Sequence, residues 1–179
     1  KKETKKQLLI GAALVLELLF LLLYLNGRID RLLDSDMSSE MILGQLLARN
    51  NGILSDQWYY STELRVLNTQ LIYALFFRLS SNWHFVRMAS TLVLWCVLIA
   101  SYGVLCRVMG CKKSFGVTAL LLAAPVSESY FRFVLVGVYY VPHLAIAFAA
   151  LALNEAYFKA KPDRKKFWLV VSVLLALVA

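Results

Sequence analysis

The sequence contains few of the residues that build disulfide or metal sites. Its three cysteines, Cys96, Cys106 and Cys111, are odd in number and form no CxxC pair, so neither a disulfide framework nor a cysteine metal site is supported. Internal repeats and low-complexity linkers are also absent from the sequence, and residues 1–179 are therefore predicted to form a single transmembrane domain. No small-residue cleavage site follows the first apolar run at 7–25, so we expect this run to remain as a membrane span.

Apolar residues, in contrast, are abundant and gathered in long blocks. The chain is 60% hydrophobic and has a mean hydropathy of +0.66, which is far above the values of soluble domains. The runs at 7–25, 86–106 and 138–157 each approach the roughly 20 residues that a helix needs to cross a bilayer. A shorter run at 115–130 is predicted to be a further span. The run at 167–179 is predicted to be an incomplete span, so we expect the chain to be the N-terminal part of a longer polypeptide.

Positive charge is plentiful but confined to a few positions. A net charge of +8 and a pI near 9.5 would suit a nucleic-acid-binding protein, yet every lysine lies within 1–6, 111–113 or 159–166. These are gaps between apolar runs that the positive-inside rule assigns to the cytoplasm. The basicity therefore indicates membrane topology, and no nucleic-acid partner is predicted.

The stretch at 64–79 decides the topology. If it crosses the membrane, the cytoplasmic loops hold seven Lys and Arg residues and the outer loops twelve; if it does not cross, the numbers are reversed. The second arrangement obeys the positive-inside rule. The leucines of this stretch recur at helical spacing, which predicts an amphipathic helix in the outer interface. We expect Leu67, Leu71 and Leu75 to be buried and Gln70 to face solvent.

These features predict an all-α polytopic protein of the cell (plasma or inner) membrane with a cytoplasmic N-terminus. A long external loop at 26–84 follows the first span. Two interfacial helices are predicted within this loop, at about 36–50 and 64–79, with turn residues between them. Membrane lipids are accordingly expected to contact both the spans and this loop.

Three acids, Asp34, Asp36 and Glu40, lie near the start of the external loop. A structural interpretation is that Asp36 caps the following helix and that Glu40, one turn later, favours its dipole. A chemical interpretation is that Asp34 and Asp36 form a paired carboxylate site. One of them would act as a general base toward a hydroxyl or amide, and a divalent cation (Mg²⁺ or Mn²⁺) would bridge a phosphate. The spacing alone leaves both interpretations open.

The order of these elements resembles the N-terminal part of the membrane-embedded glycosyltransferases of the C structural class (GT-C). This class includes oligosaccharyltransferases, protein O-mannosyltransferases and aminoarabinose transferases. The resemblance extends through an opening span and the segments LLDSDMSSEMILGQLLARNNGIL, WYYSTEL and FVRMAS. It implies transfer of a sugar from a polyprenyl-phosphate or polyprenyl-diphosphate donor to a glycan, lipid or protein acceptor at the external face of the membrane.

The resemblance also implies roles for individual acids. Asp36 matches the catalytic acid of the first external loop in this class, and Asp34 is its partner. Glu128, expected near the end of the span at 115–130, corresponds to an acid of the second external loop. Glu128 and Glu40 are thus accessory candidates.

A phosphorylated donor needs cationic partners at the outer surface. All seven basic residues predicted there are arginines, whose planar guanidinium group suits bidentate phosphate binding: Arg28, Arg31, Arg49, Arg65, Arg78, Arg87 and Arg132. Any one of them could instead balance an acid or meet a lipid headgroup. Arg87 and Arg132, at the outer ends of spans, are the predicted donor contacts. His143, one turn into the following span, either lines the same site or is a hydrogen-bonded intramembrane histidine.

Aromatic residues of the external loop have two interpretations as well. Trp58, Tyr59 and Tyr60 could stack on a sugar or an isoprenoid chain, or they could anchor the loop at the level of the headgroups.

The principal alternative to a glycosyltransferase is a transporter or lipid-carrier flippase. Such a protein is expected to carry ionisable or helix-breaking residues at mid-membrane. Glu17 alone occupies such a position, where we expect it to be paired or protonated. The acids of the first external loop cluster instead at the membrane surface, which favours the enzyme over a transporter. A non-enzymatic membrane scaffold with a partner-binding external loop is the third possibility.

Overall fold

The computed structural model describes residues 2–60 and 67–178, and all the regular structure in these residues is helical. Within these described residues, nine elements follow one another: α1 (Lys2–Asn26), α2 (Ser35–Asn50), α3 (Thr69–Phe77), α4 (Trp83–Met109), α5 (Phe115–Ala123), α6 (Glu128–Tyr130), the π-helix η1 (Phe131–Val136), α7 (Val141–Lys159) and α8 (Pro162–Val178). The predicted all-α class is confirmed.

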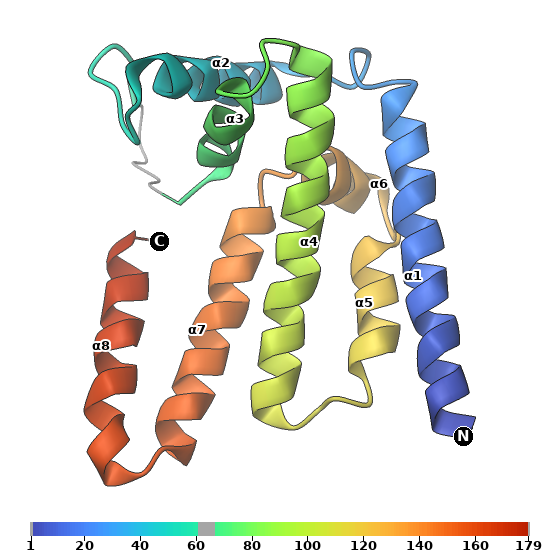
Figure 1. Ribbon diagram of the computed structural model, residues 1–179, viewed down its shortest axis with the longest axis vertical. Coiled ribbons are helices and arrows are strands. Elements are labelled where there is room, and N and C mark those ends of the chain that lie inside the picture. Colours follow the sequence, from blue (N-terminus) through green and yellow to red (C-terminus); the bar gives the residue numbers. More distant parts are fainter. Residues whose placement is uncertain (1, 61–66, 179) are drawn as a thin grey trace.

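Five of these helices form a bundle, and α2 and α3 cover one end of it. Figure 1 shows α1, α4, α5, α7 and α8 running roughly side by side, with α2 lying across the upper end and α3 beneath it. Among the described residues, three segments are long and apolar enough to cross a membrane: Lys5–Asn26, Trp83–Met109 and Val141–Lys159. The chain is thus a membrane protein.

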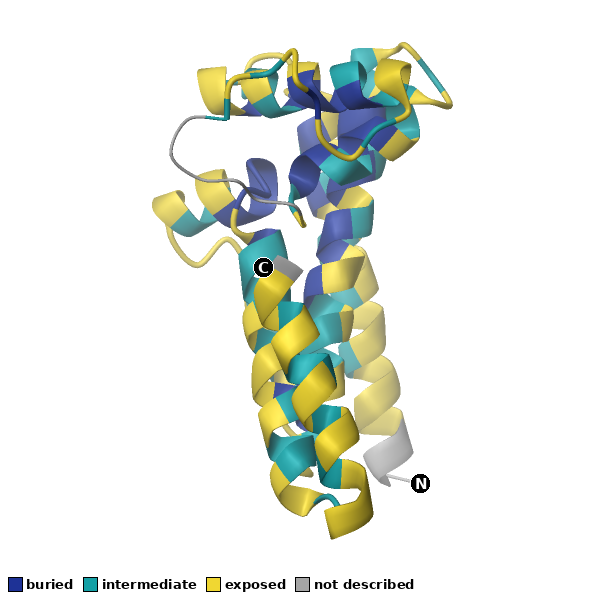
Figure 2. Ribbon diagram, turned by 90° about the vertical axis from the view of Figure 1, so that its left-hand side faces the viewer, coloured by how far each residue is buried: buried dark blue, intermediate teal, exposed yellow. Residues whose placement is uncertain are grey.

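Burial is distributed unevenly along the bundle. Buried residues concentrate beneath α2 and α3, whereas the opposite half is largely exposed apart from the contacts between helices (Figure 2). Exposed apolar side chains such as Leu8, Leu16 and Leu23 cover the outer face of α1. A helix that is apolar on its exposed face suits contact with acyl chains.

The span predicted at 115–130 is not one continuous helix. α5 ends at Ala123, and the chain resumes as α6 and η1 at an angle of 84°. The break occurs at Pro125, because a proline disfavours helical backbone in the residue before it; Ala124 is accordingly extended, with ψ of 140°. Glu128 therefore begins the second helical segment, and its side chain is exposed.

Both helices predicted in the external loop are present, although the second is shorter than expected. α2 begins one residue before the predicted start at 36 and ends as predicted. The described part of the other is α3, Thr69–Phe77. The predicted residues at 64–66 lie outside the described residues.

The buried face of α3 differs from the prediction at Gln70, Leu67 and Leu75. Gln70 is only 4% exposed, whereas Leu67 and Leu75 are 39% and 51% exposed. The reason is the close crossing of α2 and α3, where a Cβ on Gly44 would lie 2.6 Å from Cβ of Tyr73. The glycine brings the face of α3 that carries Gln70 and Tyr73 against α2. Leu67 and Leu75 are left outside, whereas Leu71 is half-buried and packs against the cluster of Leu43, Leu47 and Ala74.

The lysines gather at the end of the bundle away from α2. This end contains the start of α1, the α4–α5 loop and the α7–α8 turn (Figure 1). These segments carry the described lysines at 5–6, 112–113 and 159–166. The described acids of the 26–84 stretch and the described lysines therefore occupy opposite ends of the protein.

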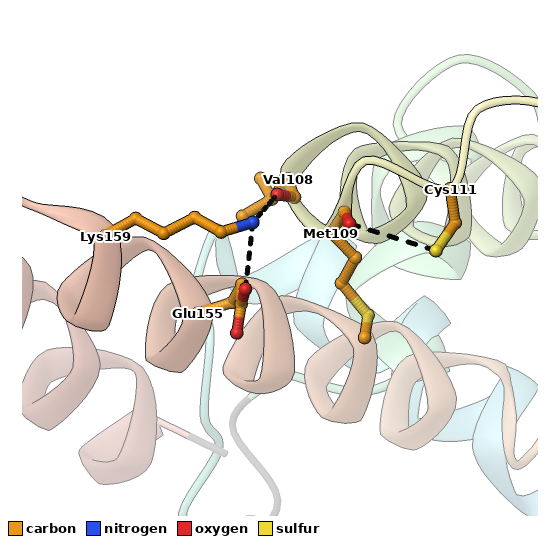
Figure 3. A network of polar contacts seen from close by, with 5 residues as sticks. All are labelled: Val108, Met109, Cys111, Glu155 and Lys159. Atoms are coloured by element: carbon orange, nitrogen blue, oxygen red, sulfur yellow. Dashed lines mark hydrogen bonds and ion pairs between the residues drawn. The ribbon is translucent and has the colours of Figure 1, made fainter.

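Lys159 also joins two helices at this end. Its Nζ lies 2.9 Å from Oε1 of Glu155 and donates a hydrogen bond to the carbonyl oxygen of Val108 at 2.8 Å (Figure 3). Val108 is in the last turn of α4, where carbonyl groups lack partners within the helix. The lysine cation thus satisfies one of these groups and interacts favourably with the helix dipole.

The arrangement predicts which positions share a side of the membrane. In a chain from which the native cysteines have been removed, single cysteines at the exposed positions Ser35, Gln57 and Ser81 should react with an impermeant thiol reagent added outside intact cells. A cysteine at Lys113 should react only after permeabilisation. Labelling at Gln57 with protection at Ser81 would show instead that the chain crosses the membrane between them.

Candidate functional site

The acidic start of α2 is held by a helix cap and by a tyrosine from far along the chain. Oδ1 of Asp34 accepts a hydrogen bond from the backbone N–H of Met37 at 2.9 Å and another from the hydroxyl of Tyr139 at 2.5 Å. Asp34, whose backbone is extended, is the N-cap of α2. The prediction that Asp36 caps this helix is therefore wrong, because α2 begins one residue before Asp36 and the cap must be the last non-helical residue.

Tyr139 reaches Asp34 by way of an unusual backbone. Val138 is fully buried and has a φ of 55°, a left-handed conformation that costs a β-branched residue roughly 1–3 kcal/mol. Gly137 leaves room for the tyrosine ring, since a Cβ there would lie 2.4 Å from Cε2 of Tyr139. Strain of this kind persists only where the surrounding structure over-determines it. Here it accompanies a contact between residues 105 positions apart.

The electrostatic environment keeps Tyr139 protonated. Burial raises the pKa of its hydroxyl, and the hydrogen bond and charge of Asp34 raise it further, with a smaller contribution from Asp36. The hydroxyl therefore remains a hydrogen-bond donor to Asp34 at neutral pH. Asp36 is exposed in the first turn of α2, so its carboxylate is open to solvent while that of Asp34 is held.

Glu40 belongs to the packing of the loop helices. It is half-buried and accepts a hydrogen bond from the hydroxyl of Thr69, the first residue of α3. This contact ties α2 to α3. Of the three predicted acids, Asp36 is thus the exposed one.

Arg87 points into the protein rather than toward the membrane surface. It is 3% exposed, and its guanidinium donates hydrogen bonds to the Tyr73 hydroxyl at 2.7 Å, to the Val136 carbonyl at 2.5 Å and to Sδ of Met37 at 2.8 Å. One side chain of α4 therefore joins α3, η1 and α2. The guanidinium of Arg87 is thus occupied by protein groups, and its predicted contact with a donor phosphate stays a prediction.

The same network includes two residues that the sequence did not single out. Burial raises the pKa of Tyr73 to about 12, against the opposing effect of Arg87, and Trp95 donates from Nε1 to the carbonyl oxygen of Leu135 at 2.9 Å. Leu135 is one of the last residues of η1, where carbonyls lack helical partners. The sequence could have linked Trp95 to Arg87, because the two residues are eight positions apart and share a face of α4.

The remaining candidates, near the predicted second external loop, differ in exposure and in their distance from Asp34 along the fold. Arg132 and Glu128 are exposed on the broken helix, and no hydrogen bond or ion pair among the described residues joins either one to Asp34. His143 is half-buried, and its Nδ1 lies 3.3 Å from the carbonyl oxygen of Tyr139. The histidine is thus adjacent to the segment that contacts Asp34.

Two of the three aromatic side chains predicted to contact a sugar or lipid pack instead within the protein. Trp58 and Tyr60 pack against the cluster formed by α2 and α3, and the Tyr60 hydroxyl accepts a hydrogen bond from the backbone N–H of Ser55 at 3.0 Å. Tyr59 is 87% exposed and is the aromatic side chain of this trio that is open to a lipid or sugar.

Glu17, the acid expected at mid-membrane, is half-buried in α1.

No group of three or more His, Cys, Asp or Glu side chains within residues 2–60 and 67–178 is arranged to hold a metal ion. The divalent cation considered above would therefore rely on the two carboxylates of Asp34 and Asp36. Comparison of the chain with protein-family models, curated proteins and solved structures finds no match.

The geometry predicts that Arg87 is needed for stability. Arg87→Met keeps much of the apolar stem but leaves the Val136 carbonyl and the Tyr73 hydroxyl without their donor, and we expect a loss of about 2–5 kcal/mol. Arg132→Met, at an exposed position, should change stability by less than about 0.5 kcal/mol. Reversible unfolding of the purified protein in detergent would compare the two. Equal stabilities would mean that the buried guanidinium contributes nothing.

Proposed function

We propose that this chain is the N-terminal transmembrane module of a GT-C-type glycosyltransferase. It would transfer a sugar from a polyprenyl-phosphate or polyprenyl-diphosphate donor to an acceptor at the external face of the membrane. The proposal rests mainly on one observation, the pair of acids at the start of α2 on the end of the bundle opposite the lysines. A lipid-linked donor would be embedded beside this end, where its phosphate meets the aqueous phase.

The two acids are suited to different tasks. Asp34 is fixed by Met37 N–H and Tyr139, so its carboxylate has a defined position. Asp36 is exposed and can approach an acceptor. In the proposed reaction Asp36 takes the proton of the acceptor hydroxyl or amide, the acceptor atom bonds to the anomeric carbon, and the sugar–phosphate bond breaks with its electron pair leaving on the phosphate.

Charge neutralisation of the leaving phosphate needs a cation. Arg132 is exposed and is the better candidate, since Arg87 is occupied within the protein. A divalent cation, Mg²⁺ or Mn²⁺, held by Asp34 and Asp36 would serve the same purpose as a Lewis acid. Under this proposal the N-terminus lies in the cytoplasm and the acids outside.

A transporter or lipid-carrier flippase is the second candidate, and the broken helix favours it. α5 and the α6–η1 segment meet at 84°, and discontinuous helices are typical of transporter binding sites. In a transporter the break would lie at a mid-membrane site and the acids of α2 would be dispensable. The two candidates therefore differ in their dependence on Asp36.

Asp36→Asn should abolish sugar transfer while preserving the fold, because the amide has nearly the shape of the carboxylate but cannot accept a proton. Loss of a positioned general base reduces the rate by about 10²–10⁴-fold. Asp34→Asn should have a smaller effect, since asparagine is also a good N-cap and retains an acceptor oxygen for Tyr139. The measurement is transfer from a radiolabelled polyprenyl-phosphate sugar by the protein in proteoliposomes.

Asp30→Asn provides the matched control, because Asp30 is an exposed acid in the turn between α1 and α2. It should retain the wild-type rate. Full transfer by Asp36→Asn would remove the catalytic role of the acid. Transport of an unmodified lipid carrier that is insensitive to Asp36→Asn would favour the flippase.

A further inference from the structure

A pocket lies between the C-terminal part of α2 and the turn that joins α3 to α4. It has a volume of about 180 Å³ and is lined by Gln45, Ala48, Arg49, Phe77 and Ser81; we call it the Arg49 pocket. Asp36 and Arg49 are thirteen residues apart on one helix, which corresponds to about 20 Å at 1.5 Å per residue. The pocket is therefore distinct from the acidic site.

The lining combines hydrogen-bonding groups with an aromatic wall. Gln45 and Arg49 are one turn apart on the same face of α2, and Ser81 adds a hydroxyl from the opposite side. The Phe77 ring packs edge-to-face on Trp83, with the ring centroids 5.7 Å apart and the ring planes at 68°. Three side chains that can donate hydrogen bonds thus meet over a supported apolar surface.

The charge around the pocket favours an anion. Arg49 is exposed, and Arg78, also exposed, directly follows Phe77. Within the described part of the chain, no carboxylate forms an ion pair with either arginine. The N-terminus of α4, two residues beyond Ser81, adds positive potential, while Arg49 offsets the negative end of the α2 dipole.

Two exposed apolar residues lie close in sequence to the residues that line the pocket. Ile42 is 47% exposed and shares the α2 face of Gln45 and Arg49. Leu79 is 71% exposed and lies in the turn between Phe77 and Ser81. A cationic pocket beside exposed leucine and isoleucine suits an amphiphile, because its charged group and its hydrocarbon would each find a matching surface.

We propose that the Arg49 pocket binds the phosphate group of a membrane phospholipid, with Arg49 as the principal contact and the hydrocarbon lying against Ile42 and Leu79. The guanidinium forms charge-assisted hydrogen bonds with phosphate oxygens, and Gln45 and Ser81 complete the set of donors. The bound lipid fixes the C-terminal part of α2 at the membrane surface. This assignment does not depend on the proposed transferase activity.

Binding of short-chain phosphatidic acid to the full chain in detergent tests the proposal, with native mass spectrometry as the readout. Inorganic phosphate and a diacylglycerol of the same chain length separate the two parts of the ligand. We expect phosphatidic acid to bind at least about tenfold more tightly than either. Equal binding of diacylglycerol would contradict phosphate recognition, and equal binding of inorganic phosphate would contradict the lipid assignment.

Variants locate the site. Arg49→Gln should weaken binding of phosphatidic acid about tenfold or more, as expected for loss of a charge-assisted contact, and Ala48→Leu should do so by filling the pocket. Arg31→Gln is the matched control, because Arg31 is an exposed arginine at the same end of the bundle, and its affinity should stay within twofold of wild type. Wild-type affinity in both Arg49→Gln and Ala48→Leu would overturn the proposal.

Discussion

The buried guanidinium of Arg87 is the interaction on which this end of the protein depends. A charged group removed from water must be surrounded by hydrogen-bond acceptors, since burial without partners costs several kcal/mol. Those acceptors come from α3, η1 and α2, which are 14, 49 and 50 residues from Arg87 in the sequence. The requirement of one side chain thus fixes the relative positions of three elements, and Met37, which it contacts, is the residue whose N–H is capped by Asp34.

The broken helix is the second constraint. A π-helix followed by a left-handed valine would be an unstable end for a helix, yet its terminal carbonyls are satisfied by Arg87 and Trp95 of α4. The same segment then delivers Tyr139 to Asp34. The position of Asp34 therefore depends on the position of the broken helix. Arg87 and Trp95 of α4 bind the end of η1, and Tyr139, which follows it, binds Asp34.

The sequence predicted the long helices well because composition alone decides them: about 20 consecutive apolar residues have few alternatives to a spanning helix. It also located α2. It failed where tertiary contacts outweigh local pattern. The leucine stripe of α3 suggested that Leu75 is buried, but the close approach allowed by Gly44 selects the face of Tyr73 instead. Similarly, the prediction of one span at 115–130 followed the apolar composition and overlooked the helix-breaking effect of Pro125.

The acidic residues were recognised from sequence, but the difference between a held Asp34 and an exposed Asp36 was not. Asp34 and Asp36 are equivalent in a local pattern, and two contacts distinguish the held carboxylate from the open one: the cap on the Met37 N–H and the hydrogen bond from Tyr139. No local signal predicts a contact across 105 positions. An arginine at the outer end of a span likewise gives no indication whether it faces a ligand or the protein interior, as Arg87 illustrates.

Hydrogen–deuterium exchange of Arg87→Met beside wild type tests the central role of Arg87 most directly. If Arg87 is the common support, amides of α2, α3 and η1 should exchange about tenfold or more faster in the variant, while those of α7 and α8 should keep their wild-type rates. Unchanged protection of α2 and α3 would contradict the account, because these helices would then be held in place without the guanidinium.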